Sequence, residues 1–79
     1  MQVQVLFFGA TAETVVQRQI EIDLARQINA AAVFAQILST YPQLKQHSLL
    51  YTVNQEYSHG EEIINEGDEL AVFTAVSGG

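Results

Sequence analysis

Hydrophobic and polar residues alternate along the first segment of the chain, QVQVLFF at residues 2–8. The two faces of this segment carry Val3, Val5 and Phe7 on one side, and Gln2, Gln4, Leu6 and Phe8 on the other. Alternation returns at residues 18–24, where the inward positions are Ile20, Ile22 and Leu24. Such a period of two is typical of strands. With TAETVVQ between them as a turn or loop, the two segments predict a β-hairpin.

The period changes to that of a helix in NAAAVFAQILSTYP, residues 29–42. Asn29 is a typical N-cap, the alanines favour a helix, and Pro42 ends it. One stripe of this helix carries Val33, Phe34, Ile37, Leu38 and Tyr41. A stripe of this width, after a hairpin, is more typical of a helix that faces the core than of a ligand groove.

Three further strands are predicted in the second half of the chain. SLLYTVNQEYS, residues 48–58, indicates a third strand, a turn at Asn54-Gln55 and a short fourth strand. A turn at Gly67-Asp68 then precedes LAVFTAV, residues 70–76. The last strand has Leu70, Val72 and Val76 on one face, and Ala71, Phe73 and Ala75 on the other. The order β-β-α-β-β-β, with one helix long enough to cover a sheet, predicts an α+β domain of the β-grasp architecture.

A single helix covers one face of such a sheet, so the other face meets water. On the assignments above, that face carries Leu6, Phe8 and Phe73. The first and last strands of a β-grasp sheet are neighbours, which places Phe8 next to Phe73, with Tyr57 able to join them. Large apolar side chains gathered in the open indicate a partner interface. If the two faces of the strands were exchanged, these side chains would be buried instead.

Composition narrows the possible functions. The chain has 79 residues, which is one domain, and a net charge of −6 from nine acidic residues against three cations, so binding to nucleic acid is disfavoured. Six acids fall at positions 56–69, either as a solubilising surface or to steer a basic partner. No cysteine is present, and His47 and His59 lack a ligand spacing, so we expect no disulfide and no metal site. Apolar runs are too short to span a membrane, and we expect a cytoplasmic protein.

The chain ends in Ser77-Gly78-Gly79, which we interpret as a flexible tail, 77–79, on a domain of residues 1–76. Glycine has no Cβ and lets the backbone enter a channel too narrow for side chains, so Gly78 suits threading and Gly79 can present its carboxylate inside another protein. A carboxylate is a poor electrophile, but coupling to AMP gives it a leaving group. Attack by sulfur would then produce a thiocarboxylate.

The sequence resembles the small, sulfur-carrying subunit of molybdopterin synthase, a ubiquitin-like family. The resemblance rests on VQVLFFGATAE at the start, YTVNQEY in the middle and EGDELAVFTAVSGG at the end, so it extends over nearly the whole chain. Its most specific part is the spacing from VNQ through EGDE to the terminal VSGG.

The resemblance implies a cycle. An adenylating enzyme of the ubiquitin-activating type consumes ATP to activate Gly79, and a sulfur-donor system converts it to the thiocarboxylate. The tail then enters the large subunit of the synthase, in an expected heterotetramer, where sulfur attacks cyclic pyranopterin monophosphate to build the dithiolene. Phe8, Tyr57 and Phe73 fall at positions of the family's apolar contact surface, and Ser77 joins this interface. The chain itself is expected to bind no cofactor and to catalyse no step.

Two alternatives remain open from the sequence. One is a sulfur carrier of the same fold that serves the thiamine pathway. The other is a ubiquitin-like modifier or a plain interaction module, in which the glycines join lysines of target proteins or have no role. An independent enzyme is disfavoured because no nucleophile, base and orienting group recur at a credible spacing.

Overall fold

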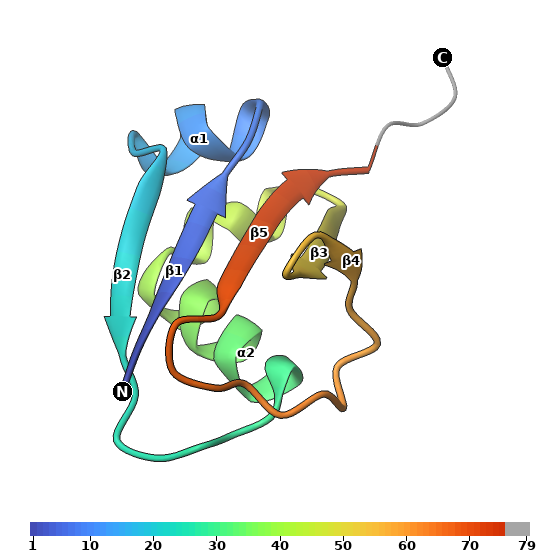
Figure 1. The fold of residues 1–79 in the computed structure, drawn as a ribbon. Coiled ribbons are helices and arrows are strands. Elements are labelled where there is room, and N and C mark those ends of the chain that lie inside the picture. The colour runs from blue at the N-terminus through green and yellow to red at the C-terminus, as the bar shows by residue number, and fades with distance from the viewer. Residues whose placement is uncertain (76–79) are drawn as a thin grey trace.

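The computed structural model describes residues 1–75, which form a five-stranded sheet with helices packed on one face (Figure 1). The strands are β1 (Gln2–Phe7), β2 (Gln19–Asp23), β3 (Leu49–Val53), β4 (Glu56–Tyr57) and β5 (Glu69–Thr74), in the sheet order β2-β1-β5-β3-β4. The helices are α1 (Ala10–Val15), α2 (Ala30–Thr40) and the 3₁₀ helix η1 (Pro42–Gln46). The α+β, β-grasp prediction is confirmed. The assignments of Val76, Ser77, Gly78 and Gly79 lie outside the described residues.

The first and last strands lie side by side at the centre of the sheet, as expected. β1 pairs with β5 in parallel, with Val5 opposite Leu70, and it pairs with β2 in the antiparallel sense. β3 completes the sheet by antiparallel pairing with β5 and carries β4 at the edge. Because β1 and β5 are parallel, the segments that follow these two strands leave the sheet at the same end (Figure 1).

The core lies between the sheet and α2. The inward residues of β1, Val3, Val5 and Phe7, are at most 2% exposed, which confirms the face assigned from their alternation. Asn29 caps α2 by accepting a hydrogen bond from the Ala32 amide at 2.9 Å. From this helix Phe34 stacks on Tyr51 at a centroid distance of 4.0 Å, and burial raises the pKa of the Tyr51 phenol.

Two sequence predictions need correction, and one element is not predicted at all. The segment TAETVVQ is not a loop, because it contributes to α1, which buries Thr11 and Val15. The turn before β5 is centred on Glu66-Gly67 rather than Gly67-Asp68, since the Asp68 amide donates to the Asn65 carbonyl at 3.1 Å. The sequence pattern predicts no element after the main helix, yet η1 forms from Pro42 and buries Leu44 completely.

The segment around Gly60 closes the N-terminus of α2. The Gly60 carbonyl accepts from the Ala31 amide at 2.9 Å, and the Glu62 carbonyl accepts from the Ala30 amide at 2.9 Å, so two free N–H groups of the helix find partners. Gly60 has φ +92°, which other residues rarely adopt, and a Cβ there would lie 3.3 Å from the Ala31 Cβ. This position requires glycine for both reasons.

We therefore expect Gly60→Ala to lower the free energy of unfolding by about 1–3 kcal/mol. Urea denaturation followed by circular dichroism would measure the loss. Gly67→Ala is the matched control, because Gly67 also has a positive φ, +83°, but a Cβ there would meet nothing within 4 Å. The loss of unfolding free energy should be larger for Gly60→Ala, because only this variant crowds Ala31. Equal losses would show that backbone conformation alone sets the cost.

Across residues 1–75, the helices are too short and too polar to serve as a membrane span.

Candidate protein interface

The sheet face opposite α2 carries a group of apolar side chains at one end. We call this group the aromatic face: Leu6, Phe8, Leu50, Tyr57, Ala71 and Phe73. Their common side follows from the strand registers. The relevant pairs are Leu6↔Ala71, Leu50↔Phe73, Thr52↔Ala71 and Thr52↔Tyr57. Residues directly opposite on neighbouring strands point to the same face of a sheet, so four strands contribute to one surface.

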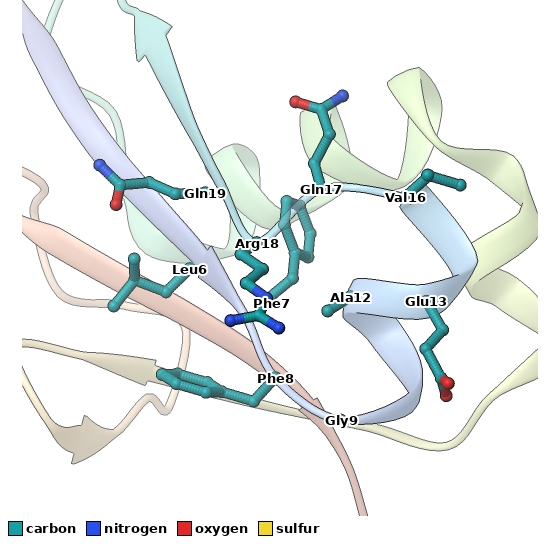
Figure 2. A pocket seen from close by; sticks show the side chains of 10 residues that line it. All are labelled: Leu6, Phe7, Phe8, Gly9, Ala12, Glu13, Val16, Gln17, Arg18 and Gln19. Atoms are coloured by element: carbon teal, nitrogen blue, oxygen red, sulfur yellow. The ribbon is translucent and has the colours of Figure 1, made fainter.

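The three aromatic residues expected from the sequence meet on this face. The Phe8 amide donates to the Val72 carbonyl at 3.1 Å, which extends the β1–β5 ladder and brings Phe8 alongside Phe73. Tyr57 and Phe73 rings lie 6.2 Å apart at 45°. Phe8 is 51% exposed and Tyr57 70%, while Phe73 is half-buried. Figure 2 shows the side chains of Leu6 and Phe8 on one side of β1 and the Phe7 ring on the other. The alternative with exchanged faces is therefore wrong.

Sequence reasoning missed Leu50. It lies in the run Leu49-Leu50-Tyr51, in which apolar residues occupy both faces of β3, so alternation does not say which one points outward. The register decides, because Leu50 pairs with Phe73 on β5. Leu50 therefore adds β3 to the aromatic face, between β5 with Phe73 and β4 with Tyr57.

The open face becomes polar away from the aromatic face. Gln4 pairs with Glu21 on one side and with Glu69 on the other, so the next row across the sheet carries no apolar side chain. The aromatic face is thus confined to the end of the sheet at which β5 finishes. Ala75, the last described residue, is fixed there by its amide, which donates to the Ser48 carbonyl at 2.8 Å. The chain that carries Gly78 and Gly79 starts from this point.

Several acids of the 56–69 stretch hold turns in place. The Asn54 side-chain carbonyl accepts from the Glu69 amide at 3.0 Å, and its amide group donates to Asp68 Oδ1 at 3.2 Å. The other carboxylate oxygen of Asp68 accepts from the Asn65 amide at 2.7 Å. The two oxygens of the Glu66 carboxylate accept from the backbone amide of Gln2 at 3.0 and 3.1 Å. The spacing between VNQ and EGDE therefore reflects hydrogen bonds that join two turns. These acids have a structural role.

The Glu62 carboxylate closes the loop before α2 in the same way. One oxygen accepts from the Ser58 hydroxyl and the Gly60 amide, both at 2.8 Å, and the other accepts from the His59 amide at 3.3 Å. Slight burial pushes the pKa of this carboxyl upward, but the hydrogen bonds outweigh it and hold the pKa below its usual value of 4.5. The ionised form is therefore the one that the folded loop prefers.

This preference predicts an acid-dependent loss of stability. Because the folded-state pKa of Glu62 is lowered, its contribution is present above the unfolded pKa of 4.5 and is lost as the pH falls through the folded value. Glu62→Gln should be less stable than the wild type at neutral pH, and this difference in stability, the gap, should shrink in acid. Thermal unfolding from pH 7 to pH 3 measures this gap. Glu61→Gln is the control, and a constant Glu62→Gln gap would contradict the assignment.

The two histidines lie in separate places. The Thr14 hydroxyl donates to the Ala10 carbonyl at 2.8 Å, so its oxygen is left to accept from His47 Nε2 at 2.9 Å. His59 stands near Glu61 and Glu62, at 4.0 and 3.7 Å from their carboxylates. Within the described part of the chain, no three His, Asp or Glu side chains gather as a metal centre.

The sequence and the fold of this chain are similar to those of known proteins. Residues 5–79 match the model of the ThiS family. The chain is similar to the molybdopterin synthase sulfur carrier subunit of Homo sapiens, with 32% identity over 83 residues that cover 99% of this chain and 94% of the human protein. Among solved structures, SAMP1 from Haloferax volcanii has a TM-score of 0.86 at 22% identity, covering 100% of both chains. A complex of subunits 1 and 2 of molybdopterin-converting factor from Helicobacter pylori 26695 contains a chain with a TM-score of 0.70 at 22% identity, again over 100% of both chains. The structural likenesses show the fold.

Proposed function

The chain belongs to the ThiS family, and from this premise we propose that it is the sulfur carrier subunit for molybdopterin synthesis. The observation that carries the proposal is the similarity, over 99% of this chain and 94% of the relative, to a protein with that name. The open aromatic face supports it, because a carrier must dock on the proteins that load and unload it. The chain carries the sulfur, and the acid-base groups and the substrate pocket belong to its partners.

The chemistry runs through the carboxyl carbon of Gly79. A partner enzyme of the ubiquitin-activating type transfers AMP from ATP to the carboxylate and releases pyrophosphate. Hydrosulfide released by a sulfur donor then attacks the carbonyl carbon, the C–S bond forms as the bond to AMP breaks, and the product is a thiocarboxylate. In the large subunit this sulfur attacks the pterin precursor, cyclic pyranopterin monophosphate, and water cleaves the remaining bond to Gly79. The carboxylate is restored, and a second delivery completes the dithiolene.

We propose that the large subunit of the synthase covers the aromatic face. The chain that follows Ala75 starts beside this face, so docking there would aim Ser77, Gly78 and Gly79 into the partner. Gly78 admits the backbone to a narrow channel because it has no side chain. Two carriers on a dimer of large subunits would make a heterotetramer. We propose the cytoplasm as the compartment, where the ATP that the cycle consumes is available.

A second candidate is a ubiquitin-like protein modifier. It is favoured by one observation: a structural neighbour that covers 95% of this chain is named small archaeal modifier protein 1. Both roles begin with adenylation of Gly79, but they differ in the nucleophile that follows. A modifier ends on lysines of other proteins, whereas a sulfur carrier ends as a thiocarboxylate.

Intact mass spectrometry separates these roles. The protein is incubated with the adenylating enzyme, ATP and a sulfur donor, and then treated with an alkylating reagent. Exchange of oxygen for sulfur gives nearly the same mass gain as oxidation of Met1, but in this cysteine-free chain a thiocarboxylate is the group that alkylates. An alkylated product that supports dithiolene formation with the large subunit is the expected result. Alkylation without that activity would favour the thiamine-pathway carrier, and conjugates of higher mass would favour the modifier.

A further inference from the structure

A groove continues from the aromatic face around the end of β1 to the corner where α1 meets β2 (Figure 2). We call it the corner groove. Its lining includes Leu6, Phe8, Gly9, Ala12, Val16 and Arg18. Leu6 and Phe8 also belong to the aromatic face, so the two surfaces are continuous. Two residues of the groove, Val16 and Arg18, are not explained by the fold.

Val16 combines exposure with an unfavourable backbone. Its side chain is 83% exposed, the highest value among the large hydrophobic residues that the structure leaves open. Its backbone has φ 60° and ψ 35°, the left-handed conformation in which a β-branched residue is an outlier. Glycine is the usual residue at this position after a helix and would relieve the strain. Stability alone therefore does not account for a valine here, whereas contact with a partner would.

Arg18 is a cation in an acidic chain, which has nine acids and three basic residues. Figure 2 shows its guanidinium group directed along β1 toward Phe8 and Ala12, while the Glu13 carboxylate points away. No ion pair between residues 1–75 involves Arg18. The guanidinium thus faces apolar side chains with its donors available, an arrangement that suits a carboxylate brought in by another molecule.

We propose that the protein partner that covers the aromatic face also fills the corner groove. It places an apolar side chain against Val16 and Ala12, and a carboxylate on Arg18. The partner is thus acidic at this point, although the acidic surface of this chain would otherwise attract basic groups. The inference rests on the proposed function, since it takes the large subunit of molybdopterin synthase as this partner.

The first test replaces Val16 with glycine. Val16→Gly should raise the melting temperature by about 4 °C, because the left-handed strain is removed. The same variant should bind the large subunit about fivefold more weakly, because the apolar contact is lost. Calorimetry of unfolding and isothermal titration with the large subunit measure the two effects. Greater stability with unchanged affinity would overturn the role of Val16.

The second test removes the charge of Arg18. Arg18→Gln should weaken binding to the large subunit about tenfold and should make the affinity less dependent on salt. Arg26→Gln is the matched control, because Arg26 is an exposed arginine in the loop after β2, outside the corner groove, and its loss should leave binding unchanged. Equal effects of the two variants would indicate general electrostatics and overturn the site.

These outcomes can be told apart from failure of the proposed function. If the wild-type chain does not bind the large subunit, or if a charge at Phe73 leaves binding intact, both the proposed interface and the corner groove are wrong. If a charge at Phe73 abolishes binding while Val16→Gly and Arg18→Gln bind like the wild type, only the corner groove is wrong. Weakened binding in all three variants supports one continuous surface.

Discussion

Deleting Gly79 is expected to abolish sulfur transfer while leaving the fold intact. The shortened chain still ends in a glycine carboxylate, that of Gly78, but this carboxylate lies one residue closer to the domain. One residue of extended chain spans about 3.3–3.6 Å. A misplacement of about 1 Å at a reacting centre can cost a hundredfold in rate, so the shorter tail should not react measurably. Alkylation of the thiocarboxylate and formation of the dithiolene with the large subunit measure the loss.

Two controls make this result specific. Addition of one alanine after Gly79 should be as damaging as the deletion, because it displaces the carboxylate in the other direction and adds a side chain. Ser77→Ala keeps the length of the tail and the position of the Gly79 carboxylate, so it should lose only the contact of the serine hydroxyl with the partner and retain most of the activity. All three variants should melt at the wild-type temperature, since they change nothing within residues 1–75. Sulfur transfer by the deletion variant at the wild-type rate would refute the carrier mechanism.

The strands and the main helix could be predicted because each repeats one period over several residues. β1 alternates without interruption, and its inward residues are buried as expected. α1 could not be predicted in this way. Its six residues, ATAETV, include two threonines and a valine, which are weak helix formers. A contact distant in the sequence holds it instead, because the Thr11 hydroxyl lies 2.9 Å from the Val72 carbonyl, in addition to 2.7 Å from the nearby Phe8 carbonyl.

The candidate site could likewise be predicted only in part. Phe8 and Phe73 were found from local alternation, and the pairing of β1 with β5 followed from the fold class. The corner groove was not found, because it depends on the left-handed conformation of Val16 and on the path of the Arg18 side chain, and no periodic signal encodes either. Local pattern therefore identified the face of the sheet, and tertiary structure was needed to see how far the surface extends.

The aromatic face itself is tested by Phe73→Asp, which should weaken binding to the large subunit at least a hundredfold. Phe73 lies between Tyr57, 6.2 Å away, and Leu50, its partner across the strands. A carboxylate at this position would be desolvated by the apolar surface of the partner without an opposite charge to compensate, at a cost of about 3 kcal/mol or more. In the free chain the same carboxylate can reach water, because the open face is not covered by α2. Isothermal titration measures the affinity, and thermal unfolding measures the fold.

Two control variants show whether the loss of binding comes from the position on the aromatic face or from the added charge alone. Gln4→Asp adds the same charge to the same side of the sheet, in the polar row, and should bind nearly as the wild type does. Val72→Asp changes the residue next to Phe73, which is fully buried on the other side of β5, and should not fold. Phe73→Asp should melt within a few degrees of the wild type, since it loses cross-strand contacts worth about 1 kcal/mol. Folded Phe73→Asp with unimpaired binding would remove the aromatic face from the interface, because every other role assigned to it depends on contact with the partner.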